Sequence, residues 1–569
     1  MLLKKKDLFF IFKSLDKKTK LKFVIFIFLV IFVAILEYLT ISESVIFAKQ
    51  LLGENLVHQH NSILGINQSI LFLLFIIFTN IGRALVTFQG IRLAYVSSSQ
   101  VCQKAYKNFL EQSYLNYLSA NSSELISIVT TKTKILSTDL LLPLIRIVSS
   151  LLMILFIGIS ILKKAPQYTI FSIFTLFIGY LIISLLTSNA MRRDSKVISK
   201  NSAEVIKIVQ ESVSSFREIK LSGFENKFFS LFSKSESKLR LSDSNIRIFS
   251  DLPRFVIEGL ILSMIIILSA VFLSSENSSY NPSIVSSLGA FLYGSQRLLP
   301  LAQTTYRSLS TVRSSTFSVR DIVKYVELKN ILNKKKCIEI DFSKNIVLKS
   351  VGFNYPKSRK KIIQNCDLEI KKGEIICILG TSGSGKSTLM DILMGLISPS
   401  EGNLYIDNVK IDSNNVISWQ KKIAHVPQEI LLIDDSIRKN IAFGIADNEI
   451  DNKKISYALK ISSLNKVIST FTNGIETKVG ERGSLLSGGQ KQRIGIARAI
   501  YHSKQILFLD EATSALDKKT EEEILKNLTN NKKNAYTIIM ITHRPRDVIK
   551  YNKIIEVKNN IIKEKYINS

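Results

Sequence analysis

The sequence predicts a helical transmembrane domain followed by an α/β domain built around a phosphate-binding loop. Long apolar stretches occupy the first 310 residues, and a glycine-rich loop follows a short apolar strand near residue 380. Hydrophobic residues make up 46% of the 569 residues, and the mean hydropathy is +0.20 although 21% of residues are charged. Two or three domains are expected at this length. We place the all-α transmembrane domain at 1–325, a linker at 326–340 and the α/β domain at 341–569.

Six apolar stretches are long enough to cross a bilayer core, which needs about 20 apolar residues per helix. They lie at 21–42, 68–89, 140–162, 167–189, 254–275 and 284–306.

Basic residues set the expected orientation of these spans. The N-terminus is rich in Lys, and segments 90–138 and 190–250 are rich in Lys and Arg, so we expect them in the cytosol with both chain termini. The two segments read as long helical extensions of the spans. The connections at 43–67 and 275–283 are expected outside; the first fits either a loop or a small external helix. Residues 9–12 fit either an interfacial amphipathic elbow or an ordinary helix start.

The net charge of +30 is compatible with nucleic acid or with anionic lipid as a partner. Because basic residues flank the apolar spans, we predict contact with membrane lipids and no nucleic-acid partner.

Short β-rich runs alternate with helical patterns after residue 340, as is typical of a largely parallel sheet. These runs lie at 346–348, 366–370, 374–379, 505–509 and 536–541. The last residues, 558–569, are expected to form a frayed polar tail.

The loop after the 374–379 strand matches the pattern G-x-x-x-x-G-K-[ST] and precedes a helical run. Its glycines allow backbone N–H groups to surround phosphate oxygens at a helix N-terminus. We expect Lys386 to neutralise the β- and γ-phosphates of a nucleotide and Ser387 to bind Mg²⁺. The expected nucleotide contacts here are Gly380, Thr381, Ser382, Gly383, Ser384, Gly385, Lys386, Ser387 and Thr388.

The apolar strand at 506–509 ends in two acids, Asp510 and Glu511. Such a strand places charges at the sheet edge where α/β proteins bind ligands. Asp510 is expected to hold Mg²⁺ through water, and Glu511 to act as general base on the attacking water. The alternative is a strand that simply ends in solvated acids.

Residues 486–493, Leu-Ser-Gly-Gly-Gln-Lys-Gln-Arg, resemble the signature motif of ABC ATPases. Ser487, Gly488, Gly489 and Gln490 begin a helix whose free N–H groups form a second anion cradle. In that family the cradle covers the γ-phosphate held by the other subunit.

Further family motifs follow the same order. The resemblance implies that Tyr355 stacks on adenine, that Gln428 senses Mg²⁺ and contacts the membrane domain, and that His543 contacts the γ-phosphate. Residues 514–517 resemble the dimer-contact loop, and residues 479–483 resemble the loop specific to exporters.

The resemblance implies an exporter-type ABC half-transporter that hydrolyses ATP with Mg²⁺. We expect a homodimer with two composite sites, embedded as a multi-pass protein in the bacterial inner (plasma) membrane. Short transverse helices near 112–122 and 213–226 are expected to dock on the ATPase domains. The expected cycle is alternating access.

Charged residues within the spans suggest the substrate. They are Glu37, Arg83, Arg146, Arg254, Glu258 and Arg297. Because arginine predominates, an amphipathic anionic substrate is expected; the alternative is that these charges pair internally or snorkel to the interface. Segments 214–221 and 252–258 resemble flippases of lipid-linked oligosaccharides, so an anionic glycolipid is the expected substrate.

Other functions are also compatible with parts of the sequence. A multidrug or peptide exporter would share every motif. An ATP-gated channel or regulator without net pumping is a different class, against which the intact Glu511 argues. A soluble ABC protein acting on DNA or ribosomes is excluded by the apolar spans.

Overall fold

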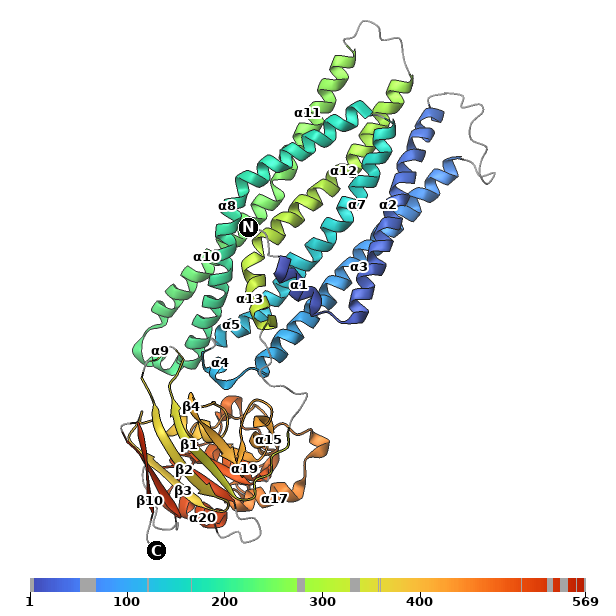
Figure 1. The fold of residues 1–569 in the computed structure, drawn as a ribbon. Helices are drawn as coiled ribbons and strands as arrows, with labels where there is room; N and C mark the ends of the chain where they lie inside the picture. Colours follow the sequence, from blue (N-terminus) through green and yellow to red (C-terminus); the bar gives the residue numbers. More distant parts are fainter. Residues whose placement is uncertain are drawn as a thin grey trace. The chain divides into compact units, whose positions relative to one another are not determined.

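The computed structural model describes residues 5–51, 68–119, 122–164, 166–273, 282–327, 338–356, 358, 360–502, 504–529, 536–542, 551–558 and 560–566. The chain forms two compact units (Figure 1). The first comprises residues 1–111 and 120–329, and the second comprises residues 112–119 and 330–569.

Long helices running side by side build the first unit (Figure 1). They are α2 (Lys17–Leu51), α3 (Gln68–Leu110), α7 (Leu142–Lys164), α8 (Pro166–Ser214), α10 (Glu225–Asp251), α11 (Pro253–Leu273) and α12 (Pro282–Ser314). The described residues of each predicted span fall on one of these helices, except residues 140–141, which belong to the π-helical turn before α7. Among the described residues, three stretches are long and apolar enough to cross a membrane: Lys17–Ser44, Ser69–Leu110 and Ser123–Lys163. The fold class is thereby confirmed, and the count of six spans stays a prediction.

Two helices, α3 and α8, extend far beyond the apolar stretches, as expected, and α8 alone has 49 residues. Helix α10 is separate and ends before the predicted span at 254–275. Short helices occur at both predicted transverse positions, α4 (Tyr114–Ser119) and α9 (Phe216–Ser222). Between α4 and α7 the chain forms α5 (Ser122–Ser127), a π-helical turn η1 (Ile128–Lys132), α6 (Thr133–Ile135) and a second π-helical turn η2 (Leu136–Leu141). The expected external helix at 43–67 lies largely outside the described residues.

The N-terminal residues form a separate helix, α1 (Lys5–Lys13), which packs against α13 (Thr316–Glu327). Ile11 of α1 is fully buried while Phe9 is 61% exposed, so the helix has one buried and one exposed apolar face. Residues 9–12 therefore form an amphipathic helix of their own, distinct from the first span.

A buried ion pair holds α13 in the first unit. Lys132 is 2% exposed, and its ammonium donates to the carboxylate of Asp321, which also accepts from Ser199. Although burial disfavours the charge of Asp321, the Lys132 ammonium and the Ser199 hydroxyl hold its pKa below the ordinary value. The pair thus joins η1, α8 and α13 by charge.

Replacing Lys132 by Met should destabilise the first unit at neutral pH, because the Asp321 carboxylate would remain buried without its partner. The expected loss is about 3 kcal/mol. It should shrink at pH 4.5, because protonation removes the orphaned charge of Asp321 in the variant, while the native pair stays ionised since its pKa lies below the ordinary value. Thermal unfolding of the detergent-solubilised protein by circular dichroism, at pH 7 and pH 4.5, measures this. The control is Lys207→Met, which removes an exposed pair with Glu211; an equal loss in both variants would contradict the prediction.

Two sheets form the second unit. A four-stranded antiparallel sheet has the order β2-β1-β4-β5, and a six-stranded, largely parallel sheet has the order β10-β9-β3-β8-β7-β6. The strands are β1 (Asn345–Phe353), β2 (Ile363–Lys371), β3 (Ile375–Gly380), β4 (Glu401–Ile406), β5 (Val409–Lys410), β6 (Ile423–Val426), β7 (Ile506–Asp510), β8 (Thr537–Ile541), β9 (Lys553–Lys558) and β10 (Ile561–Tyr566). All five predicted β-rich runs fall on strands.

The prediction of a frayed tail at 558–569 is wrong. Residues 561–566 form β10, which pairs antiparallel with β9 from Ile561↔Lys558 to Tyr566↔Lys553. Asn560 has φ +66°, a conformation that Asn tolerates in tight hairpin turns. The polar composition misled the prediction, because an edge strand needs only one covered face and commonly carries lysines.

Helices of the second unit cover the sheets. They are α14 (Lys386–Leu393), α15 (Val416–Gln420), α16 (Ile437–Ile441), α17 (Asn452–Ile461), α18 (Asn465–Ile468), α19 (Gly488–Tyr501) and α20 (Lys518–Thr529), with short 3-10 turns at Asp447–Glu449, Gly474–Glu476 and Glu481–Gly483. Strand β7 separates two hydrophobic cores. Ile506 and Phe508 belong to the core around α14, and Leu507 and Leu509 belong to the core around α19. Burial on both faces explains the continuous apolar run.

Candidate nucleotide-binding site

The strand order brings the predicted motifs to one edge of the six-stranded sheet. Strands β3, β8, β7 and β6 are neighbours and parallel, so their carboxyl ends lie together. The glycine-rich loop follows β3, Asp510 ends β7, and Gln428 lies two residues after β6. Ligands of open α/β sheets bind at this edge.

Two glycines in the loop have physical reasons to be glycine. A Cβ on Gly380 would lie 2.5 Å from the carbonyl oxygen of Val557 in β9, too close for any side chain. Gly385 precedes α14 with φ +105°, a backbone conformation that disfavours every residue with a Cβ. The loop therefore wraps tightly onto the N-terminus of α14, with its N–H groups available for anions.

Lys386 places a positive charge inside this loop. Lys386 is only 7% exposed. Its ammonium donates to the carbonyls of Gly380 (2.9 Å) and Thr381 (3.0 Å). The hydroxyl of Ser384 is buried with no hydrogen-bond partner in the described structure. A buried polar atom of this kind is rare unless a ligand satisfies it, so the loop fits a phosphate group.

Tyr355 lies beside the same loop. Its hydroxyl is 3.1 Å from the hydroxyl of Thr388 in the first turn of α14, and its ring contacts Phe353 edge to face at 5.1 Å. The ring is thus held near the phosphate loop, as stacking on a base would require.

Glu511 and Gln428 meet at the carboxyl ends of β7 and β6. The amide Nε2 of Gln428 donates to the Oε2 of Glu511 over 2.9 Å. The backbone of Glu511 has φ +47°, a left-handed conformation that costs a residue with a side chain about 1–2 kcal/mol. Strain of this kind is retained where surrounding bonds hold a residue in place, which is common at active sites.

Gln492 contacts the backbone at Glu511 and beside it. This residue was not singled out from the sequence as a site residue. Its amide Nε2 lies 3.5 Å from the carbonyl oxygen of Glu511 and donates to Ser514 Oγ over 3.1 Å, while its Oε1 accepts from the N–H of Ala515. Gln492 is 5% exposed. Its position within the signature motif, residues 486–493, is the sequence feature that could have identified it as a site residue.

Burial and neighbouring charge raise the pKa of two carboxyls at this edge. Burial, and then the charge of Glu511, raise the pKa of Asp510. Burial and the charge of Asp510 raise the pKa of Asp391, on α14, to about 6. Acids crowded in this way attract a cation.

These residues fit Mg²⁺, which prefers oxygen ligands and usually shares them with substrate phosphates. The Ser387 hydroxyl, the Asp510 carboxylate and the Gln428 amide oxygen supply that chemistry. Within the described residues, no group of three or more His, Cys, Asp or Glu side chains could hold a metal by itself.

The signature motif begins α19 with a complete capping box. The Ser487 hydroxyl accepts from the N–H of Gln490 (3.3 Å), and the Gln490 side chain accepts from the N–H of Ser487 (2.9 Å). Ser487 and Gly488 are exposed. A Cβ on Gly489 would lie 3.0 Å from the carbonyl of Ala515, so residues 514–517 pack directly on this helix start.

His543 lies outside the described residues, so its predicted contact with a phosphate stays a prediction. It follows Thr542, whose N–H donates to Ile378 of β3. The remaining predicted site residues are described. This one sheet edge brings together four of the predicted site elements: the glycine-rich loop, Asp510, Glu511 and Gln428.

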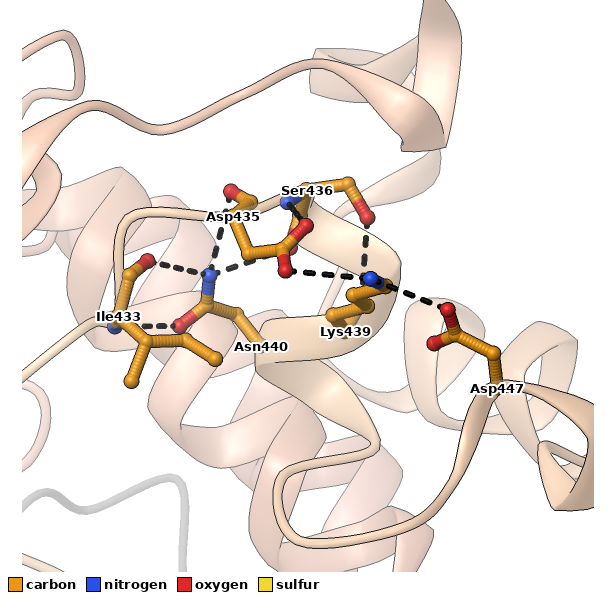
Figure 2. A network of polar contacts seen from close by, with 6 residues as sticks. All are labelled: Ile433, Asp435, Ser436, Lys439, Asn440 and Asp447. Carbon is orange, nitrogen blue, oxygen red and sulfur yellow. Dashed lines mark hydrogen bonds and ion pairs between the residues drawn. The ribbon is translucent and has the colours of Figure 1, made fainter. Parts of the chain in front are cut away.

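A buried network fixes the segment that follows Gln428 (Figure 2). Asn440 is fully buried; its Nδ2 donates to the carbonyls of Ile433 (3.0 Å) and Ser436 (3.1 Å), and its Oδ1 accepts from the N–H of Ile433. Arg498 of α19 donates to the carbonyl of Asn440 over 2.8 Å. Asn440 thereby ties this segment to the signature helix.

Beside it, Lys439 lies between Asp435 (3.2 Å) and Asp447 (3.1 Å), as Figure 2 shows. All three side chains are partly or largely exposed, so these ion pairs contribute little by themselves. The buried Asn440 is the member of the network on which the segment depends.

Replacing Asn440 by Ala should destabilise the second unit by about 2–4 kcal/mol, because several buried backbone groups lose their partner. Trp419 is the single tryptophan of the chain and is fully buried in this unit, so urea unfolding followed by its fluorescence reports the change. Asn465→Ala, at an exposed position, is the matched control and should stay within 0.5 kcal/mol of the native protein, roughly. A loss no larger than that of the control would show that the network is dispensable.

Comparison with known proteins agrees with this geometry. Residues 363–514 match the family model for the ABC transporter. The multidrug resistance-like ATP-binding protein MdlA of Buchnera aphidicola is 35% identical over 356 residues, covering 62% of this chain and 60% of that protein. The ATP-dependent lipid A-core flippase of Legionella pneumophila is 32% identical over 395 residues, covering 68% of this chain and 65% of that protein.

Among solved structures, a bacterial Atm1-family ABC exporter with ATP bound superposes with a TM-score of 0.80 at 19% identity, covering 97% of this chain and 96% of that chain. This likeness shows the fold of the whole chain. The chain spans less than two thirds of the length of the curated relatives described above.

The fold and the phosphate-binding edge define the second unit as an ABC transporter ATPase domain. The chain fuses this domain to a helical membrane-type domain, in the fold of an ABC exporter.

Proposed function

We propose that the protein hydrolyses ATP and uses the energy to move an amphipathic substrate across a membrane. The observation that carries the proposal is the contact between Gln428 and Glu511 at the edge where Lys386 and Asp510 also lie. A phosphate cradle, a carboxylate base and an amide that links the base to the neighbouring strand are the parts phosphoryl transfer requires.

The chain's own residues perform the binding and the proton transfer. Lys386 and the loop N–H groups hold the β- and γ-phosphates, and Tyr355 stacks on the adenine. Glu511 orients the attacking water and takes its proton, and Gln428 keeps the carboxylate in position. Ser387, Asp510 and Gln428 would hold Mg²⁺, which would neutralise part of the charge on the phosphates. His543 is proposed to contact the γ-phosphate.

The exposed start of α19 supports a homodimer as the working unit. Ser487, Gly488, Gly489 and Gln490 offer a second anion cradle whose cap is already complete. In the proposed dimer this cradle closes over the nucleotide held by the partner chain. Binding of ATP then closes the two ATPase domains, and hydrolysis releases them, which drives alternating access.

The short helix α4 supports coupling between the two activities. Residues 112–119 cluster with the second unit, where Tyr114 and Leu115 pack beside the core that includes Phe353 and Met390. We propose that α4 carries movement of the ATPase domain to the helices on either side of it. Helix α9 is proposed to serve in the same way.

The proposed location is the bacterial inner (plasma) membrane, as a multi-pass protein with both termini in the cytosol. Relatives named lipid A-core flippases support this location and a lipid substrate. The finer proposal is an anionic glycolipid such as a lipid-linked oligosaccharide. Relatives named multidrug resistance-like keep a multidrug exporter as the second candidate.

The charges predicted to line a substrate cavity are largely paired with one another. Arg83 lies 3.5 Å from Glu37, which is 2% exposed, and Arg254 lies 3.5 Å from Glu258 one turn away. The alternative of internal pairing therefore describes these four residues. Arg146 remains a candidate for substrate contact.

Replacing Glu511 by Gln should lower ATP turnover at least a hundredfold and leave ATP binding intact, because the amide cannot take the proton. The measurement is phosphate release by the purified protein in nanodiscs, with bound ATP quantified after gel filtration. Glu449→Gln, at an exposed position, is the matched control and should turn over ATP normally. Normal turnover in the Glu511 variant would remove the role assigned to this residue.

ATP turnover in nanodiscs should rise when a polyprenyl-pyrophosphate oligosaccharide is added, since substrate promotes closure of the ATPase dimer. The comparison set is an uncharged polyprenol and a panel of hydrophobic drugs. Stimulation by the drugs alone would favour the multidrug exporter. Turnover that no compound changes, with no substrate moved into sealed vesicles, would favour an ATP-gated device without pumping.

A further inference from the structure

A cavity of about 350 Å³ lies in the first unit between α8, the end of α12 and α13. Three arginines line it: Arg192, Arg313 and Arg320. None of them was among the charged residues singled out from the sequence. The rest of the lining is mainly small and polar and includes Ser184, Ser188, Asn189 and Thr316.

These arginines have little negative charge to balance them. Among the described residues, Arg320 has one carboxylate neighbour, Asp7, at 3.8 Å, and its Nη2 is buried with no hydrogen-bond partner. Arg313 donates to the Ser184 hydroxyl, and in the described part of the chain no acid lies within ion-pair distance of Arg192 or Arg313. Like charges that converge on a polar cavity without counter-charges are unfavourable unless an anion joins them.

A second cavity, of about 370 Å³ and lined mainly by apolar side chains, adjoins the first. The two share Ser184 and Arg313 as lining residues. Tyr180 also lines the apolar cavity, where its ring stacks on Tyr306 at 5.0 Å and its buried hydroxyl has no hydrogen-bond partner among the residues that the structure describes. A polar cavity rich in arginine therefore continues into an apolar one.

The two cavities follow one another along the predicted spans, the apolar cavity first and the arginine-lined cavity toward the cytosolic end. The apolar lining belongs to segments 151–154, 180–184 and 298–310, which lie inside or at the cytosolic end of predicted spans. Arg192 and Arg313 follow the predicted cytosolic ends, residues 189 and 306, by about 5 and 10 Å of helix. The apolar cavity thus lies at the depth of lipid chains, and the arginines lie at the depth of headgroups on the cytosolic side.

We propose that these paired cavities bind an amphipathic lipid through a phosphate-type headgroup, with the phosphate among Arg192, Arg313 and Arg320 and an acyl or prenyl chain in the apolar cavity. Guanidinium groups match phosphate oxygens in geometry and charge. The proposal rests on the proposed function and names its substrate class at a defined site. The site is a loading position reached from the cytosolic leaflet, distinct from the paired charges Glu37–Arg83 and Arg254–Glu258.

The test measures lipid binding by the full-length protein in detergent without ATP. Fluorescence anisotropy of labelled short-chain phosphatidic acid gives its Kd. Unlabelled dioctanoyl phosphatidic acid should displace the probe, while dioctanoylglycerol and millimolar inorganic phosphate should displace it at least tenfold less effectively. Displacement by inorganic phosphate at the same concentration as the lipid would assign the arginines to a free anion and overturn the lipid proposal.

Substitutions then locate the site. Arg313→Gln and Arg320→Gln should each raise the Kd at least tenfold, as loss of a charge-assisted hydrogen bond predicts. Arg192 is exposed, so Arg192→Gln tests the headgroup contact without risk to folding. Arg193→Gln is the matched control, because Arg193 is the next residue on α8, its side chain is 75% exposed and it pairs with Asp194. The Kd of this control should stay within twofold.

Ala302→Phe, which fills the apolar cavity, should weaken phosphatidic acid binding. A Kd unchanged in all three arginine variants would overturn the site. Phosphate release from ATP, measured on the same preparations, separates the two proposals. Arginine-dependent lipid binding without any ATP turnover would keep the site and remove the proposed function. ATP turnover together with lipid binding that does not depend on the arginines would keep the proposed function and remove the site.

Discussion

The parallel pairing of β3, β8, β7 and β6 is the constraint on which the ATPase domain depends. Parallel strands point their carboxyl ends to the same edge, so loops far apart in sequence meet there. The register Leu509↔Met540 fixes Asp510 opposite Ile541, next to the strand that leads into the phosphate loop. A slip of one residue would exchange the two faces of β7, which are buried in different cores.

Helix α19 is the second element that organises the site. Its first residues carry the Ser487–Gln490 capping box, Gln492 contacts the backbone around Glu511, and Arg498 near its end binds Asn440. One helix therefore contacts Glu511, the neighbouring residues 514–515 and the segment that follows Gln428. Displacing that segment requires either breaking the Asn440 bonds or moving α19 with it.

The membrane-type domain uses polar contacts for a different purpose. Apolar side chains pack with little discrimination between helix registers, whereas hydroxyl and charge pairs have one partner and one distance. Thr40 of α2 lies 2.8 Å from Thr79 of α3, and Ser150 of α7 lies 2.7 Å from Thr305 of α12. These pairs fix neighbouring helices in register.

The sequence by itself determined the elements and motifs that depend on local pattern. Apolar length specified the helices, short β-rich runs specified the five strands that include β3, β7 and β8, and contiguous strings specified the phosphate loop and the signature helix. These features are encoded within a few turns or one strand, so periodicity and spacing reveal them.

The tertiary structure decided the partners. Register and packing between distant elements bring Gln428 to Glu511 and Arg83 to Glu37. They also bury Gln492 and Asn440 as links between segments and place three arginines around one cavity. The sequence also misassigned β10, whose stability comes from pairing with β9 rather than from its composition. Local pattern specifies what a segment becomes, while long-range pairing, which no local window contains, specifies what it meets.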